Sequence, residues 1–151
     1  MIIKVDEKNI LQAATIHSVS WQESHKSFCS EEFIKIHTPE RQKQYLQKKM
    51  DAGSEVYMLA EEKPIAIVSI TGDIIEDLYV VPDKQNNGYG TILLEFAIGR
   101  CKSNPRLWIL ENNKGAERLY RKMGFVETGR VNFVDKGLDE IEFFIPLTRY
   151  N

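Results

Sequence analysis

Residues 78–94 read Leu78-Tyr79-Val80-Val81-Pro82-Asp83-Lys84-Gln85-Asn86-Asn87-Gly88-Tyr89-Gly90-Thr91-Ile92-Leu93-Leu94. An apolar, β-branched run ends at a proline, a short polar loop with two glycines follows, and an apolar helical pattern begins at once. This order predicts a strand, a turn rich in free backbone amides and a helix N-terminus. The amides and the positive end of the helix dipole meet at one point, which binds an anion without any charged side chain.

Three kinds of phosphate-binding loop share this general form, and their spacing separates them. A P-loop ends in Gly-Lys-Ser/Thr, whereas here Gly90 is followed by Thr91 and Ile92. The dinucleotide-binding fingerprint needs a third small residue at the position of Leu93, and an acid about twenty residues later. What remains is Gln-x-x-Gly-x-Gly after a strand that ends in Val-x-Pro. On this segment alone, an ordinary strand–loop–helix connection also stays open.

A second motif occupies residues 113–125. It reads Asn113-Lys114-Gly115-Ala116-Glu117-Arg118-Leu119-Tyr120-Arg121-Lys122-Met123-Gly124-Phe125. Together the two segments resemble, in order and spacing, the two signatures of the GNAT superfamily of acetyl-CoA-dependent N-acetyltransferases. The resemblance covers residues 56–144 well and residues 1–50 only loosely. It implies the α/β GNAT fold, a central mixed and mostly antiparallel twisted sheet with helices on both faces.

The composition is that of an ordinary globular protein. A length of 151 residues suits one domain with its own core, and we interpret residues 1–151 as a single GNAT domain. A formal net charge of −2 does not indicate the basic surface that binds nucleic acid. Cys29 and Cys101 lie far apart and lack metal-ligand spacing, so reduced thiols, a cytoplasmic location and no metal are expected. No apolar run is long enough to span a membrane.

The rest of the chain predicts alternating strands and helices. Strands are expected at residues 2–5, 56–60, 65–70, 74–81, 107–110, 125–134 and 141–147. Helices are expected after Asp6, at 30–34, 38–53 and 89–103, and after Asn113. Because a helix joins them, the strands at 74–81 and 107–110 should be parallel.

Two of the expected helices carry side chains with a predicted orientation. The helix after Asp6 should turn one apolar face toward the sheet, made of Ile10, Leu11, Ala14 and Ile16. The helix at 38–53 carries three lysines that we interpret as its solvated face, Lys43, Lys48 and Lys49.

The resemblance also implies how acetyl-CoA is held as a co-substrate. The loop amides would bind the pyrophosphate, and the end of the preceding strand would face the pantetheine arm, with one N–H group stabilising the thioester oxygen. Asn113 would cap its helix and touch the cofactor as well. The implied cofactor-binding residues are Leu78, Tyr79, Val80, Val81, Gln85, Asn86, Asn87, Gly88, Tyr89, Gly90, Thr91, Asn113, Ala116 and Tyr120.

For catalysis, the resemblance assigns the general acid to Tyr120. The pKa of a thiol is near 8.5 and that of a phenol near 10, a gap of about 1.5 units or roughly 2 kcal/mol that a positioned phenol can span. Many relatives carry an acid at the position of Ile74, from which this chain departs. Strand alternation puts Ile74, Glu76, Leu78 and Val80 on one face, so Glu76 is the nearest substitute as base. Asp77 would point the opposite way unless a bulge intervenes, and another group or water stays open as the base.

The acceptor pocket should come from the first helices. Trp21, His25 and Phe28 cluster beside three acids, Glu23, Glu31 and Glu32, and such a patch would suit a cationic amine. The same residues could instead dock their helix on the sheet. His25 is also a minor candidate for proton transfer.

The main hypothesis is therefore an N-acetyltransferase that acts on a primary amine of a small molecule by direct attack. Acetylation of a protein or peptide N-terminus is the alternative within the same chemistry. A non-catalytic acyl-CoA-binding module is the alternative of a different class; the absent strand acid favours it and Tyr120 argues against it. Neither a nucleic acid nor a membrane is expected as a partner. Family habit and exposed edge strands near the C-terminus favour a homodimer.

Overall fold

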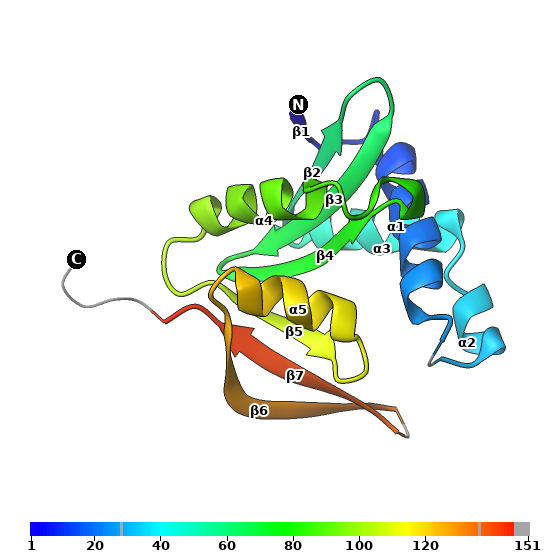
Figure 1. Cartoon of the computed structure of the whole chain (residues 1–151). Helices are drawn as coiled ribbons and strands as arrows, with labels where there is room; N and C mark the ends of the chain where they lie inside the picture. Colours follow the sequence, from blue (N-terminus) through cyan, green and yellow to red (C-terminus); the bar gives the residue numbers. More distant parts are fainter. Residues whose placement is uncertain (28, 136, 147–151) are drawn as a thin grey trace.

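The computed structural model describes residues 1–27, 29–135 and 137–146. A seven-stranded mixed sheet with helices on both faces forms the molecule (Figure 1), which confirms the expected fold class. The strands are β1 (Ile2–Lys4), β2 (Glu55–Ala60), β3 (Pro64–Thr71), β4 (Ile74–Val80), β5 (Arg106–Leu110), β6 (Val126–Asp135) and β7 (Leu138–Phe144). The helices are α1 (Ile10–His25), α2 (Glu31–Lys35), α3 (Pro39–Asp51), η1 (Pro82–Lys84), α4 (Tyr89–Arg100) and α5 (Lys114–Lys122).

The strands lie in the order β1-β2-β3-β4-β5-β7-β6. Neighbouring strands are antiparallel except β4 and β5, which are parallel as their connecting helix predicts. The parallel pair is short, since only Ile74 and Arg106 are matched in it. The two strands therefore diverge beyond Ile74.

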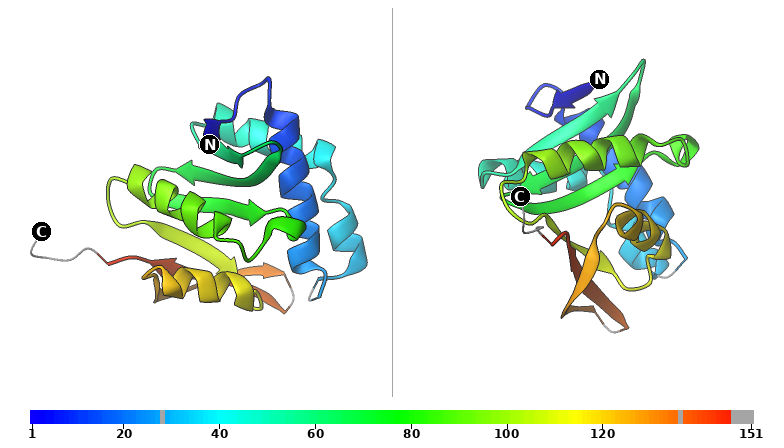
Figure 2. Two further views of the ribbon diagram at one scale, coloured as in Figure 1. Left: turned by 45° about the horizontal axis from the view of Figure 1, so that its top comes forward. Right: turned by 60° about the vertical axis from the view of Figure 1, so that its left-hand side comes forward.

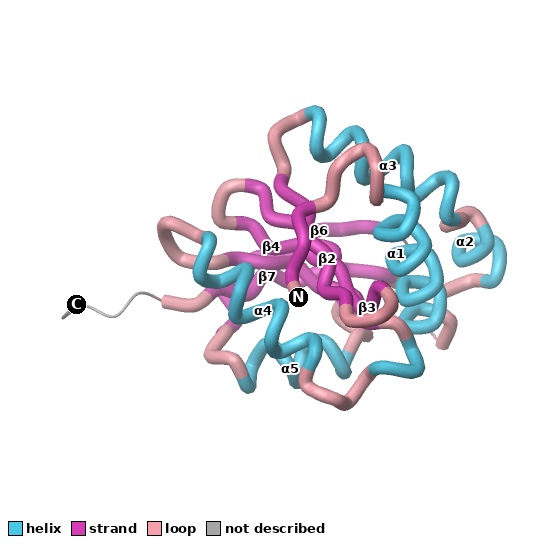
Figure 3. The backbone as a smooth tube through the Cα atoms, turned by 90° about the horizontal axis from the view of Figure 1, so that it is seen from above, coloured by secondary structure: helices cyan, strands magenta, loops and turns pink. Residues whose placement is uncertain are grey.

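Two apolar layers hold the helices on the sheet. Helices α1 and α3 cover one face, and α4 and α5 cover the other (Figures 2 and 3). The layer under α4 and α5 contains Leu93, Leu94 and Tyr120 packed on side chains of β3, β4 and β5. The layer under α1 and α3 contains Ala13, Ala14 and Leu46 packed on β2 and β3. A strand whose two faces are both covered can present residues to either side, and β4 is such a strand.

Ser30 and Thr38 cap their helices as expected, whereas Asp6 does not cap α1. The Ser30 hydroxyl accepts from Phe33 N–H, and the Thr38 hydroxyl accepts from Arg41 N–H, at 3.1 and 3.2 Å. Helix α1, however, begins only at Ile10, because Asp6 caps the turn before it by accepting from Lys8 N–H and Asn9 N–H.

The late start of α1 overturns one predicted orientation. Leu11 was expected to face the sheet, yet 54% of its surface is exposed. Ile10, Ala14 and Ile16 are buried as expected. Ile10, Ala13, Ala14 and His17 have the spacing of one helical stripe. Leu11 lies one residue, or about 100°, off this stripe.

Strand β6 forms one edge of the sheet and carries exposed apolar side chains. Phe133 has 76% of its surface exposed, and Val131 is exposed beside it. Among the described residues, no helix is both long and apolar enough to cross a membrane.

Candidate active site

The loop between β4 and α4 presents backbone amides at a helix N-terminus. The first bond inside α4 runs from Ile92 N–H to Gly88 C=O at 3.1 Å, and no side chain caps the helix. The amides of Tyr89, Gly90 and Thr91 therefore precede the first N–H group that is bonded within the helix. Asn86 and Gly88 both have positive φ, 65° and 87°, so two residues of the loop adopt the left-handed conformation just before the helix. These features fit a diphosphate at this point.

The side chains of the loop brace its own backbone. Gln85 Nε2 donates to Val80 C=O at 3.1 Å, and Asn87 Nδ2 donates to Lys84 C=O and Gln85 C=O at 3.1 and 3.0 Å. A Cβ built on Gly90 would meet only ordinary contacts, at 3.6 Å from Leu119 and Val80. Internal packing thus does not require glycine at position 90, which is consistent with a ligand approaching the backbone there.

A cleft of about 250 Å³ lies where β4 and β5 diverge. Residues 75–80 of β4 have no partner in β5, so this edge of the strand faces the cleft without a neighbouring ladder. The cleft brings together six of the predicted site residues, Trp21, His25, Glu76, Leu78, Tyr79 and Tyr120, and it also touches Asn113 and Ala116. Eight of the 17 residues that line the cleft are thus among the predicted site residues.

Tyr120 reaches this cleft from α5. Its residue is only 7% exposed, and its hydroxyl makes no hydrogen bond to any described residue. Burial raises the pKa of Tyr120 above its usual value, and the negative charge of Asp77 adds to the effect. The phenol therefore stays protonated at neutral pH and can donate. Asn113 caps α5 as predicted, because its Oδ1 accepts from Ala116 N–H at 3.2 Å.

A β-bulge interrupts β4 at Asp77. On β3, Ile67 pairs with Tyr79 and Ser69 pairs with Glu76, so one residue of β3 opposes two of β4. Asp77 has φ = 55°, which is unusual for any residue but glycine.

The bulge makes the predicted alternation along β4 wrong. Leu78 and Val80 pack in the α4–α5 layer, together with Ile75. Tyr79 and Val81 pack in the α1–α3 layer, toward which Glu76 also reaches. Glu76 and Leu78 were expected on the same face, but the extra residue between them turns the following side chains over.

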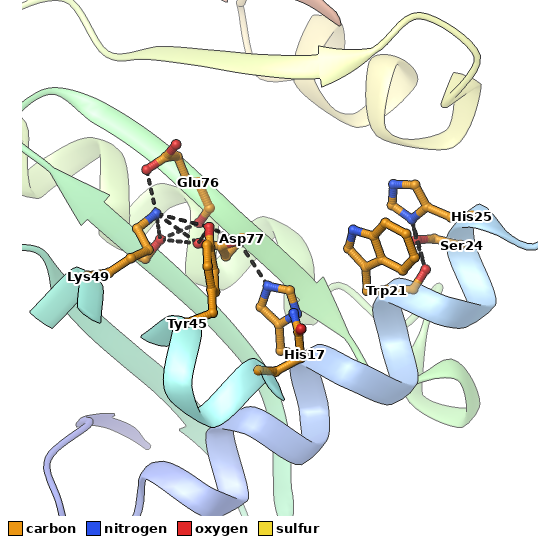
Figure 4. A network of polar contacts seen from close by, with 10 residues as sticks. His17, Trp21, Ser24, His25, Tyr45, Lys49, Glu76 and Asp77 are labelled. Atoms are coloured by element: carbon orange, nitrogen blue, oxygen red, sulfur yellow. Dashed lines mark hydrogen bonds and ion pairs between the residues drawn. The ribbon is translucent and has the colours of Figure 1, made fainter. Parts of the chain in front are cut away.

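Glu76 and Asp77 consequently share one partner (Figure 4). The Nζ of Lys49 lies 2.5 Å from Glu76 Oε1 and 3.0 Å from Asp77 Oδ2. Asp77 was expected to point away from Glu76, and the bulge is the reason that it does not. The side chain of Lys49 is only 14% exposed. The interpretation of Lys49 as part of a solvated face is therefore wrong.

Four further contacts enclose the Asp77 carboxylate, whose side chain is 9% exposed. Oδ1 accepts from His17 Nε2 at 2.9 Å, Oδ2 accepts from Ser69 Oγ at 2.6 Å, and the Tyr45 hydroxyl lies 3.1 Å from both oxygens. His17 is fixed in turn, because its Nδ1 lies 2.8 Å from Gln42 Nε2. An amide nitrogen only donates, so Nδ1 accepts and Nε2 carries the proton.

This environment shifts the protonation of both charged partners. Burial alone would raise the pKa of Asp77, but hydrogen bonds from His17 and Ser69 and the charge of Lys49 outweigh it and hold that pKa well below its usual range. Burial alone would lower the pKa of Lys49, but Asp77, Tyr45 and Glu76 raise it. Asp77 is thus a fixed anion and Lys49 a fixed cation, and Asp77 is a poor proton acceptor.

The aromatic residues near the end of α1 form a stack. The Trp21 ring lies between two imidazoles, with centroids 4.0 Å from His25 and 3.6 Å from His37. Both faces of the indole are thereby covered, so its edge rather than its π-face meets the cleft. Burial lowers the pKa of His25 to about 4 and outweighs the hydrogen bond between its ring and the Trp21 carbonyl, which alone would raise that pKa. His25 is therefore neutral at pH 7, and Phe28 lies outside the described residues.

The three acids predicted beside Trp21 do not line the cleft. Glu23 and Glu31 pair on the surface with Lys26 and Lys35, and Glu32 is exposed. The carboxylates that the cleft does contain are Glu76, Asp77 and Glu140, and no lysine or arginine occurs among its described lining residues.

The sequence analysis missed His17, Tyr45, Lys49 and Asp77 as parts of one cluster. One signal was present in α3, where Gln42, Leu46 and Lys49 follow the spacing i, i+4, i+7 of a single face. A lysine on the stripe of a buried leucine needs an acidic partner, because an unpaired charge is rarely buried.

Comparisons with known proteins agree with this geometry. A family model described as an acetyltransferase (GNAT) domain matches residues 10–144. The chain is similar to the peptidyl-lysine N-acetyltransferase YjaB of Salmonella typhimurium, with 33% identity over 79 residues, which are 51% of this chain and 52% of that protein. The match therefore spans about half the length of that curated relative.

Two solved structures extend the likeness to the whole fold. One is the PaiA N-acetyltransferase of Thermoplasma acidophilum in complex with coenzyme A, with a TM-score of 0.69, 18% identity, and coverage of 94% of this chain and 96% of that chain. The other is the ribosomal-protein-S18-alanine N-acetyltransferase of Escherichia coli, with a TM-score of 0.71, 18% identity, and coverage of 100% and 96%. With the family model matching most of its length, the chain belongs to the GNAT acetyltransferase family.

Proposed function

We propose that this protein is an N-acetyltransferase that moves an acetyl group from acetyl-CoA to a primary amine by direct attack. The observation that carries the proposal is the cleft at the diverging β4 and β5, which the protonated Tyr120 hydroxyl shares with the unpaired edge of β4 and where it has no hydrogen bond to a described residue. Acetyl-CoA supplies the activated acetyl group as a thioester. A binding module without activity would not need a buried phenol that has no hydrogen-bond partner in the described part of the chain.

Each part of the site has a role in this proposal. The amides of Gln85 to Thr91 hold the pyrophosphate, and the backbone of residues 78–81 orients the pantetheine arm. An N–H group of this strand stabilises charge on the thioester oxygen. Tyr120 gives its proton to the departing sulfur. Glu76, whose side chain is 40% exposed at the cleft, takes the proton of the amine directly or through water.

The charge of the cleft supports a cationic acceptor. Its described lining holds three carboxylates and neither a lysine nor an arginine, and His25 is neutral there. An alkyl amine has a pKa of about 10.4 and arrives as a cation. A small-molecule amine without an acidic group fits this lining. The side chain of a peptidyl lysine has the same chemistry, and the similarity to YjaB favours it as the second candidate.

Two measurements test the proposal. Calorimetry should show acetyl-CoA binding, and release of free thiol should depend on an added amine. Across a panel, simple diamines and lysine-containing peptides should react faster than amino acids with a free carboxylate, because the latter place a negative charge beside Glu76 and Glu140. Absence of cofactor binding would reject the proposal, and binding without thiol release over the panel would favour the acyl-CoA-binding module.

Gly88→Ala should weaken acetyl-CoA binding by roughly tenfold. Gly88 has φ = 87°, and an alanine in this left-handed conformation is strained by about 1–2 kcal/mol. The loop can relieve this strain only by shifting, and the shift moves its amides away from the position that binds the pyrophosphate. Titration calorimetry gives the Kd. Gly72→Ala is the matched control, since Gly72 has φ = 64° in the turn between β3 and β4, outside the loop. The assigned role of the loop fails if both variants bind like the wild type.

A homodimer and a cytoplasmic location stay predictions. The exposed apolar side chains of β6 favour pairing of this edge with a second chain. Sedimentation velocity would decide the first point.

A further inference from the structure

A buried lysine lies directly behind the proposed reaction cleft. Lys49 Nζ lies within hydrogen-bond distance of Glu76 Oε1, Asp77 Oδ2 and Ser69 Oγ, at 2.5, 3.0 and 3.2 Å. An ammonium has three protons to donate, and these three acceptors come from two adjacent strands. The direction of the ammonium is therefore fixed by the sheet.

The residues around Lys49 are fixed as well. Asp77 is held by His17 from α1 and by Tyr45 from α3, and His17 is held by Gln42. Figure 4 shows how these side chains converge from the two helices on the bulge of β4. A continuous set of contacts thus runs from α1 and α3 to the Lys49 ammonium.

Glu76 is the one member of the cluster that reaches the cleft with little else to hold it. Its carboxylate has a single hydrogen-bond partner among the described residues, which is Lys49. A glutamate that is 40% exposed and has no such partner would sample several rotamers. A base is effective only when it is held within reach of the proton that it takes.

We propose that Lys49 is a positioning residue of the acetyl-transfer site: its ammonium holds the Glu76 carboxylate at the cleft, while Asp77 and His17 hold the ammonium. This inference rests on the proposed function. It assigns to α1 and α3 a part in catalysis besides covering the sheet. The loop between β4 and α4 makes none of these contacts, so cofactor binding does not depend on Lys49.

The test compares Lys49→Gln, Lys49→Arg and a control, Lys48→Gln, whose side chain is exposed on the same helix turn. Turnover is normalised to the number of CoA-binding sites found by calorimetry, so that only folded protein counts. Lys49→Gln should lower kcat about tenfold, which is less than the 10²–10⁴-fold that a general base contributes as a whole, because Glu76 itself is still present. The Kd for CoA should stay within about twofold of the wild-type value. Lys49→Arg should recover most of the loss because it keeps the charge. Lys48→Gln should behave as wild type.

A double-mutant cycle shows whether Lys49 acts through Glu76. When Lys49→Gln is added to Glu76→Gln, the normalised kcat should fall by less than about twofold, because the carboxylate that Lys49 positions is already gone. Additive losses would overturn the proposal, as would a normalised kcat that stays at the wild-type value in Lys49→Gln.

A milder variant covers the case in which Lys49→Gln does not fold. Tyr45→Phe removes a hydroxyl 3.1 Å from Asp77 and 3.4 Å from Lys49 without removing a charge. It should lower the normalised kcat about twofold to threefold, again only when Glu76 is present. If Lys49→Gln does not fold, an unchanged kcat in Tyr45→Phe would overturn the proposal. A wild-type protein that releases no thiol with any amine would instead refute the proposed function itself.

Discussion

Tyr120→Phe is expected to lower turnover by a factor of about 100 or more, within the range that a general acid contributes. The substitution removes the proton donor proposed for the departing sulfur. It keeps the aromatic ring, whose edge packs on Phe125 with centroids 5.7 Å apart. The hydroxyl has no hydrogen bond to a described residue, so its loss leaves no partner unsatisfied. Thiol release at saturating substrates measures the turnover, and calorimetry should give a nearly unchanged Kd for acetyl-CoA.

Tyr57→Phe is the matched control for this experiment. It removes a hydroxyl from a second buried tyrosine, on β2, which donates to Glu55 at 2.9 Å and does not line the cleft. Its turnover should equal that of the wild type. If Tyr120→Phe is as active as Tyr57→Phe, the proton comes from another donor and the role of Tyr120 is lost.

Asp77→Ala should lower the free energy of unfolding by about 3–5 kcal/mol, the usual cost of removing one partner from a buried ion pair. The change leaves the Lys49 ammonium with one carboxylate instead of two, and it takes the acceptor from His17 Nε2. It also places an alanine at φ = 55°, where aspartate and asparagine are better tolerated. Urea denaturation followed by circular dichroism measures the change.

Asp77→Asn separates the backbone effect from the charge effect. Asparagine keeps the shape and the tolerance for positive φ but loses the negative charge, so it should destabilise the protein less than alanine does. Equal stability of Asp77→Ala and the wild type would mean that this cluster does not support the fold.

The same carboxylate predicts a direction for the pH dependence of stability. The folded state holds the pKa of Asp77 far below that of the unfolded chain, which is about 3.9. The folded protein therefore binds fewer protons, and the stabilisation is present above about pH 5 and is lost as the pH falls below about 4. The stability of Asp77→Asn should fall less steeply over this interval. An identical slope would contradict the assigned protonation state.

The loop between β4 and α4 and the helix α5 could be predicted because their chemistry is local. A proline, two glycines and an apolar period fix the end of β4 and the start of α4 within a few residues of each other. Asn113 caps α5 for the same reason, since the side chain bonds an amide three residues later. No information from elsewhere in the chain is needed for either element.

The bulge of β4 could not be predicted because its causes are distant in sequence. Asp77 is held by His17 and Tyr45, which precede it by 60 and 32 residues. Before these helices are placed on the sheet, nothing near Asp77 indicates an extra residue. One extra residue in a strand reverses the alternation of all side chains that follow it. Glu76 and Leu78 were therefore predicted on the same face although they lie on opposite faces.

The reversal of faces within β4 has a consequence for the length of this strand. Removing Asp77 would restore plain alternation and leave the neighbouring side chains on their present sides, with Leu78 and Val80 toward α4 and α5 and Tyr79 and Val81 toward α1 and α3. Both layers would keep the volumes that they were built to hold, and only the carboxylate that contacts Lys49 and His17 would be lost. A one-codon deletion here would therefore shorten a central strand by one residue without turning it over.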